Sequence, residues 1–304
     1  MDSFEVIETR EGSGRGYVNG CYPCWHMNEG YDIFLVPSQY ASIQAAVDAV
    51  ERPTTIVVLP GNYAESIVVI DKPYVVIQSQ ALSKRGVTLV GGDGPAVMVV
   101  RHSALYLSGI GIRSNARLKG VLVEDATFSL QECTVAGNRI GAASNGAGSG
   151  MECRRATIHL QKSTVAGNTV DTTGGGSAAR GAGLFLEDCR VEIVGSTIQA
   201  NEAYAESVAQ GGGIWCERTR MRMWRSRVTE NTLNAPHCAG GGIYIDGAGL
   251  YELGGSVITA NGFPDGSGGG IHVEAGATGL AVHANTRVRQ NHPDDIHGGG
   301  DWRD

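Results

Sequence analysis

The chain lacks an excess of basic residues, a long apolar run and a basic, apolar leader. Its 304 residues include 24 Lys and Arg against 31 Asp and Glu, a net charge of -7. Binding to a phosphate backbone needs clustered Lys and Arg, so we expect no nucleic-acid partner. No apolar stretch approaches the length that spans a bilayer, so we expect no membrane partner. The start Met1-Asp-Ser-Phe-Glu does not resemble a signal peptide, and we expect a cytoplasmic protein or a mature fragment of a secreted one.

Cysteine is too scarce, and odd in number, for a disulfide framework. The seven cysteines fit a reducing compartment better, and Cys153 and Cys216 fall on inward strand positions, where a cysteine acts as a small hydrophobic residue. Cys21 and Cys24, with His26 nearby, resemble half of a zinc site, because two thiolates two residues apart can share one tetrahedral ion. The second half is missing, so a metal site and a metal-free loop both stay open.

What the chain does contain is a repeat. A short phrase with an apolar Val or Ile ends in asparagine six times, at intervals of 30 or 33 residues: Asn138, Asn168, Asn201, Asn231, Asn261 and Asn291. A second phrase, a strand that begins with glycine, runs in step with the first at Gly120, Gly150, Gly183, Gly213, Gly242 and Gly270. Two markers with one common period in this range indicate a solenoid.

The local pattern identifies the kind of solenoid. Within each repeat apolar residues alternate in twos, which is typical of strands and not of helices. Three short strands per coil, stacked in parallel, predict an all-β right-handed parallel β-helix of about eight coils. The asparagines would then lie in the same turn of every coil, where each buried amide can bond to the amides above and below.

The two ends differ from the repeats. We predict an irregular arm or cap over residues 1–36 and one β-helix domain over residues 37–304. Ile43, Ala46, Val47 and Val50 share one helical face, which predicts a capping helix at about residues 42–51 with Ser42 as N-cap. The tail after Asn291 has no helical pattern, so either the tail or a second subunit covers the last coil, which leaves a homo-oligomer open.

The residues after position 37 carry a family resemblance. Ser42-Ile-Gln-Ala-Ala-Val and Val58-Leu-Pro-Gly-Asn-Tyr-Ala-Glu-Ser-Ile67 resemble the cap and first coil of pectin-lyase-like β-helix proteins, pectin methylesterases in particular. The glycine and asparagine phrases resemble the repeats of polymorphic outer-membrane β-helix proteins. The resemblance implies the fold and little about activity, because this superfamily hosts lyases, hydrolases, esterases and adhesins. The segment that carries the catalytic aspartate of the methylesterases has no counterpart here, and no membrane barrel follows the repeats.

The outward face of the glycine-led strands is the predicted site. One column of that face holds the rings of Phe185, Trp215, Tyr244 and His272, and the next holds Glu187, Glu217, Asp246 and Glu274. An exposed row of rings beside carboxylates suits the stacking and hydrogen bonding of a sugar. The alternative is that the rings only stabilise the sheet.

Glu217, Asp246 and Glu274 are the predicted catalytic residues. Carboxylates about 4.8 Å apart raise one another's pKa or recruit a counterion. Two chemistries follow, oxygen ligation of Ca²⁺, as in the resembling lyases, or the acid and nucleophile of a retaining glycosidase. A face neutralised by loop residues is the plainer alternative.

We therefore predict a carbohydrate-interacting β-helix protein, a polysaccharide lyase or glycoside hydrolase, with an oligo- or polysaccharide partner. A non-enzymatic protein-interaction scaffold is the second hypothesis, and isomerase or cyclase chemistry inside a loop-walled groove is the third.

Overall fold

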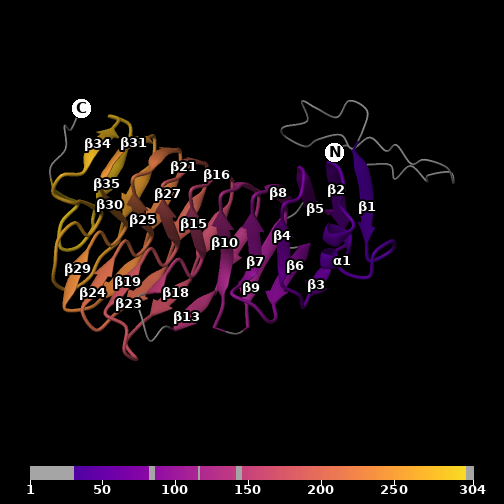
Figure 1. The fold of residues 1–304 in the computed structure, drawn as a ribbon. Coiled ribbons are helices and arrows are strands. Elements are labelled where there is room, and N and C mark those ends of the chain that lie inside the picture. The colour runs from indigo at the N-terminus through magenta and orange to yellow at the C-terminus, as the bar shows by residue number, and fades with distance from the viewer. Residues whose placement is uncertain (1–30, 82–85, 116, 142–145, 299–304) are drawn as a thin grey trace.

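The computed structural model describes residues 31–81, 86–115, 117–141 and 146–298. In these residues the chain winds as a solenoid, with its early strands at one end and its late strands at the other (Figure 1). Each coil adds one strand to each of three long sheets, and consecutive strands within a sheet come from consecutive coils. The paired strands run parallel throughout, as in β20 with β25 and β25 with β30.

The longest sheet has ten strands. In spatial order it contains β1 (Asp32–Val36), β2 (Thr54–Val58), β5 (Val75–Ser79), β8 (Ala104–Ser108), β11 (Thr127–Gln131), β16 (Thr157–Gln161), β21 (Arg190–Val194), β26 (Arg220–Trp224), β31 (Ala248–Gly254) and β34 (Thr278–Val282).

The other two long sheets have nine strands each. The glycine-led sheet contains β4 (Ile67–Ile70), β7 (Ala96–Arg101), β10 (Lys119–Glu124), β15 (Met151–Arg154), β20 (Leu184–Glu187), β25 (Ile214–Glu217), β30 (Ile243–Asp246), β33 (Ile271–Val273) and β36 (Ile296–Gly298). The third sheet contains β3 (Gly61–Tyr63), β6 (Val87–Gly91), β9 (Ile110–Ser114), β12 (Thr134–Ala136), β17 (Thr164–Ala166), β22 (Thr197–Gln199), β27 (Arg227–Thr229), β32 (Val257–Thr259) and β35 (Arg287–Arg289).

The core runs along the solenoid axis. In β26, Met221 and Met223 are buried while Arg220 and Arg222 are exposed, which is the predicted alternation in twos. The corner before β26 is sharp because Arg218 adopts the left-handed conformation, as Asp188 does one coil earlier. Side chains of the same kind therefore stack in register from coil to coil, and apolar columns fill the interior.

A second layer of strands covers much of the glycine-led sheet. The segments that follow Asn138, Asn168, Asn201 and Asn231 pair into two four-stranded sheets. One contains β13 (Arg139–Gly141), β18 (Thr169–Asp171), β23 (Glu202–Tyr204) and β28 (Thr232–Asn234). The other contains β14 (Gly146–Ala147), β19 (Ala178–Arg180), β24 (Val208–Gln210) and β29 (His237–Ala239). A separate apolar cluster fills this layer, with Ile140, Val170, Ala203, Leu233 and Phe263 among its members.

A helix lies near the amino-terminal end, as the sequence predicts, although it is shorter than expected. The helix α1 (Ile43–Asp48) is N-capped by Ser42, whose Oγ accepts the N–H of Ala45 at 3.1 Å. Ile43, Ala46 and Val47 are buried in the main core. That α1 shields the end of the solenoid from water stays a prediction.

The all-β parallel solenoid is confirmed, and the number of coils differs slightly from the eight expected. Strand β1 was not expected, because it falls within residues 1–36. It pairs with β2 over five residues and so belongs to the ten-stranded sheet. No helix in the described part of the chain is long and apolar enough to cross a membrane.

Candidate functional site

The predicted ring column forms, but it is not exposed. The rings of Phe185 and Trp215 stack at 4.5 Å, and those of Tyr244 and His272 stack at 5.0 Å. Phe185, Trp215 and Tyr244 are at most 4% exposed, because the second layer lies on them and Ala239 packs against their cluster. Their prediction as exposed platforms for a sugar is therefore wrong. His272 keeps a side-chain exposure of 12%.

In the carboxylate column, Glu187 and Glu217 are neutralised by an arginine, as in the plainer alternative. Arg218, in the turn after β25, forms ion pairs with Glu187 and Glu217. Asp246 lies in register with Glu217 one coil on, and its charge also acts on Arg218. A catalytic part for Glu217 and Asp246 stays a prediction.

The predicted metal sites find no support among the described residues. Cys21, Cys24 and His26 lie outside them. Within them, no group of three His, Cys, Asp or Glu side chains is arranged to hold a metal ion. Ca²⁺ therefore stays a prediction.

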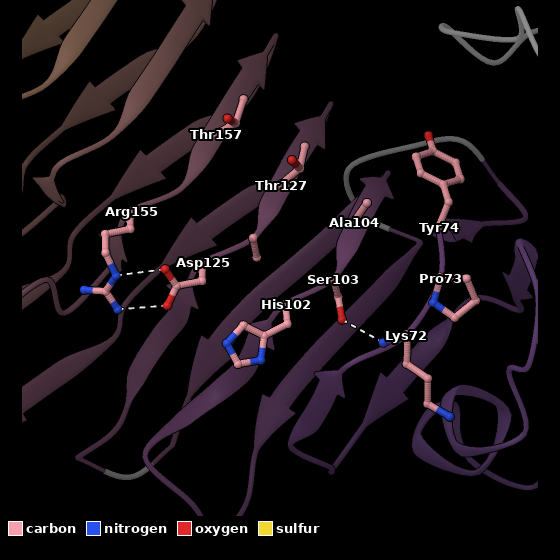
Figure 2. Close-up of a pocket in the computed structure, with 11 residues that line it drawn as sticks. Lys72, Pro73, Tyr74, His102, Ser103, Ala104, Asp125, Thr127, Arg155 and Thr157 are labelled. Atoms are coloured by element: carbon pink, nitrogen blue, oxygen red, sulfur yellow. Dashed lines mark hydrogen bonds and ion pairs between the residues drawn. The ribbon is translucent and has the colours of Figure 1, made fainter.

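An accessible concave surface runs along the outward side of the ten-stranded sheet, from the turn before β5 to β26, and we call it the trough. Its first hollow has a volume of about 550 Å³ and lies at the turns that lead into β5, β8, β11 and β16 (Figure 2). Arg155 holds Asp125 through two hydrogen bonds of 2.8 and 2.9 Å, and the pKa of Asp125 is lowered chiefly by this contact. His102 lies on the same side, with its Nδ1 atom 3.2 Å from Asp71 Oδ1.

Two further hollows continue from the first along the sheet. The second, of about 540 Å³, shares Tyr74 and Thr127 with the first, and its lining includes Tyr106, Gln131, His159, Gln161 and Glu192. The third, of about 80 Å³, shares His159 and Glu192 with the second, and its other lining residues are Arg190, Val191, Arg220 and Arg222. Because neighbouring hollows share walls, they form one open trough that crosses successive coils.

Hydrogen-bonding groups line the trough in register. Tyr106 donates its hydroxyl to Gln131 one coil away. His159 Nδ1 lies 3.5 Å from Glu192 Oε2, and both side chains are close to half exposed. Arg222 pairs with Glu252 one coil on at 3.0 Å, while Glu192 on the preceding coil faces His159.

A tryptophan lies at the far end of the same face. Trp224 on β26 pairs with Val194 on the neighbouring strand β21. The centroids of the Trp224 and His283 rings lie 5.1 Å apart. The indole lies over Gly254, where an added Cβ would be 1.8 Å from a ring carbon. Trp224 is only partly buried, so one aromatic platform remains accessible beside the trough.

The sequence comparison decides the family of this architecture. The profile described as "Right handed beta helix region" matches residues 59–291, well over half of the chain. The chain belongs to the right-handed β-helix family. No curated protein matches this β-helix protein significantly.

Two solved structures resemble this β-helix protein weakly. Two crystal structures of a pectin methylesterase from Aspergillus niger, in penultimately deglycosylated and deglycosylated forms, are 13% identical to it. Each alignment covers 91% of this chain and 92% of the other, with TM-scores of 0.41 and 0.40. A likeness at this level carries no conclusion about activity.

Near the carboxyl-terminal end of the β-helix, three predicted site residues do meet. Tyr244 donates its hydroxyl to Glu274 Oε2, and His272 Nε2 lies 3.5 Å from the same oxygen. The pKa of Glu274 is lowered, chiefly by the hydrogen bond from Tyr244. Burial lowers the pKa of His272. The predicted residues of this cluster thus share hydrogen bonds rather than a sugar-binding face.

Sequence reasoning missed two sets of residues in this β-helix. The trough residues Tyr106, His159 and Trp224 lie at alternate, outward positions of their strands, so the alternation in twos could have located them. Ser267 lies in a segment with no repeat phrase and contacts His272. No sequence signal pointed to it.

Proposed function

We propose that this β-helix protein binds an oligosaccharide or polysaccharide along the trough. The observation that carries the proposal is the continuity of the three hollows, which share Tyr74, Thr127, His159 and Glu192. Strands of a sheet lie about 4.8 Å apart, so the face from β5 to β26 extends over roughly 24 Å. A groove of this length and openness suits an extended polymer better than a small, enclosed ligand.

The lining supports a sugar ligand. Gln131, Gln161 and Glu192 offer amide and carboxylate groups that can bond to hydroxyls. Tyr74 and Trp224 present ring surface beside them, and aromatic side chains combine an apolar face with a polar edge or tip. Such a mixture of flat apolar surface and hydrogen-bonding groups matches the two kinds of surface on a sugar ring.

The third hollow favours an acidic sugar. Arg190 and Arg220 lie directly opposite one another on β21 and β26, and both are exposed. Like charges in this position repel one another. A carboxylate or sulfate on the ligand would relieve that repulsion and gain charge-assisted hydrogen bonds. The trough therefore suits an anionic polysaccharide.

The trough supports binding more strongly than glycoside hydrolysis. Most glycosidases need two carboxyl groups that flank the bond to be cleaved. Glu192 is the one carboxylate among the described lining residues of the second and third hollows. His159 and Glu192 are the acid and the base that a lyase would need. We therefore propose lyase activity as a more specific function of the trough, in addition to binding.

Calorimetric titration with an acidic and a neutral hexasaccharide tests the proposal. Arg190→Ala and Arg220→Ala should each weaken binding of the acidic sugar about tenfold, because each removes a charge-assisted contact of about 1.5 kcal/mol. Arg227→Ala is the matched control, since it removes an equally exposed arginine from the third sheet. Equal losses in all three variants, or no binding to any sugar, would reject carbohydrate binding at the trough and favour the protein-interaction scaffold.

A further inference from the structure

A hydroxyl, an imidazole and a carboxylate lie in series near the carboxyl-terminal end, away from the trough. Ser267 Oγ lies 3.0 Å from Nδ1 of His272. Nε2 of the same ring lies 3.5 Å from Glu274 Oε2. This is the order of groups that activates a serine, a nucleophile on a base that a third group orients.

The surroundings of His272 favour its role as a base. A carboxylate beside Nε2 retains the ring proton there, which leaves Nδ1 free to accept the proton of Ser267. Burial lowers the pKa of His272, so the ring is neutral at neutral pH. The rings of Tyr244 and His297 stack on its two sides at 5.0 and 5.3 Å and hold its plane.

The two residues after Ser267 add a place for an anionic oxygen. The backbone N–H groups of Gly268 and Gly269 both donate to Asp294 Oδ1, the latter at 3.0 Å. Two amides that converge on one negative oxygen have the form of an oxyanion site. Gly268 has a φ of +67°, and a Cβ there would lie 2.7 Å from His272 Cβ, so glycine keeps these amides against the imidazole.

We infer that Ser267, His272 and Glu274 form a second, hydrolytic site that takes carboxylic esters. Ser267 Oγ attacks the acyl carbon while its proton passes to His272 Nδ1, and the ester oxygen then leaves as an alcohol with that proton. Water then attacks the acyl carbon of the acyl-serine while its proton passes to His272 Nδ1. That proton returns to Ser267 Oγ as the acid leaves. Glu274 is a positioning residue, and the substrate oxygen displaces Asp294 from the two amides.

A fluorophosphonate probe tests this inference on the full chain. The probe's phosphorus forms a bond to Ser267 Oγ and releases fluoride, and mass spectrometry locates the adduct. We expect labelling at Ser267, with a rate that falls to half below pH 6.5 as His272 becomes protonated. Wild-type protein without an adduct on Ser267 would overturn the inference, and this readout does not depend on the folding of any variant.

Variants separate the chemistry from chance labelling. Ser267→Ala should abolish both the adduct and the hydrolysis of p-nitrophenyl acetate, and His272→Gln should slow both about a hundredfold or more. Ser207→Ala, at a half-buried serine in an earlier segment, is the control and should react as wild type does. Hydrolysis that survives Ser267→Ala undiminished would overturn the inference, whereas the trough titrations are unaffected by either outcome.

Discussion

At the residue scale, the asparagines form the predicted ladder. Each donates Nδ2 to the Oδ1 atom of the next, at 2.8 to 2.9 Å from Asn138 to Asn291, and Asp295 accepts the final bond at 2.9 Å. Each Oδ1 from Asn168 onward also accepts the backbone N–H of the asparagine before it. The ladder therefore satisfies buried polar groups in one turn of six coils.

Asn201→Ala should strongly destabilise the protein. It leaves the N–H of Asn168 without a partner and removes one of the two acceptors of the Asn168 Nδ2, which keeps Val135 O. The cost is about 2 to 6 kcal/mol, from about 1 to 3 kcal/mol for each lost buried bond. Thermal unfolding followed by circular dichroism measures the effect. Asn234→Ala, at an exposed position in β28, is the control. Equal melting temperatures for the two variants would contradict the structural role of the ladder.

Acid should weaken the fold through His272. Its pKa is lowered in the folded protein, so its stabilising contribution is full above the unfolded value of about 6.5 and is lost as pH falls toward the folded pKa. The groups that face the ring are Glu274, His297, Ser267 and Tyr244. Urea unfolding at pH 7 and pH 5 should show a smaller pH effect in His272→Gln than in wild type. An unchanged or larger effect in the variant would contradict the assigned burial.

At the scale of the elements, the strands of the glycine-led sheet begin with glycine because the next coil and the asparagine ladder leave no room for a Cβ. A Cβ at Gly213 would lie 2.6 Å from Gly242 O and 2.9 Å from Asn231 Nδ2. The same conflict recurs at Gly183 and Gly242. The sequence phrase thus marks the place where successive coils and the asparagine ladder pack most tightly.

Gly213→Ala should therefore destabilise the protein, by about 1 to 3 kcal/mol or more, because the neighbouring coil must shift to admit the methyl group. Gly174→Ala is the matched control, since a Cβ there meets nothing within 4 Å. Chemical unfolding of both variants compares the two sites. A free energy of unfolding that is unchanged in Gly213→Ala would contradict this prediction, because it would show that the coils can separate without cost.

The second layer is the element that sequence reasoning could not predict. The repeat phrases identify the three long sheets, because each phrase pairs with its own copy one coil away. The segments that form β19 and β24 are rich in small residues and vary in length, so they show no clear alternation. Whether the face under them is open depends on long-range packing, and for that reason Phe185 and Trp215 were expected at the surface.

At the scale of the whole molecule, one sheet is covered by a second layer, and the hollows that we propose as a binding surface lie on another. The family and the solenoid could be predicted from the asparagine and glycine periods. The position of the trough could not be predicted in this way. The outward residues of every sheet show the same alternation, and only the folded chain distinguishes a covered face from an accessible one.

The most direct test compares the two faces with the same ligand, an acidic hexasaccharide, by calorimetric titration. Trp224→Ala removes the accessible ring beside the trough, and Phe185→Leu changes a covered ring of the glycine-led face. We predict that Trp224→Ala weakens binding about tenfold, the effect of losing about 1.4 kcal/mol of ring contact, while Phe185→Leu binds as wild type does. Undiminished affinity in Trp224→Ala together with a loss in Phe185→Leu would contradict it.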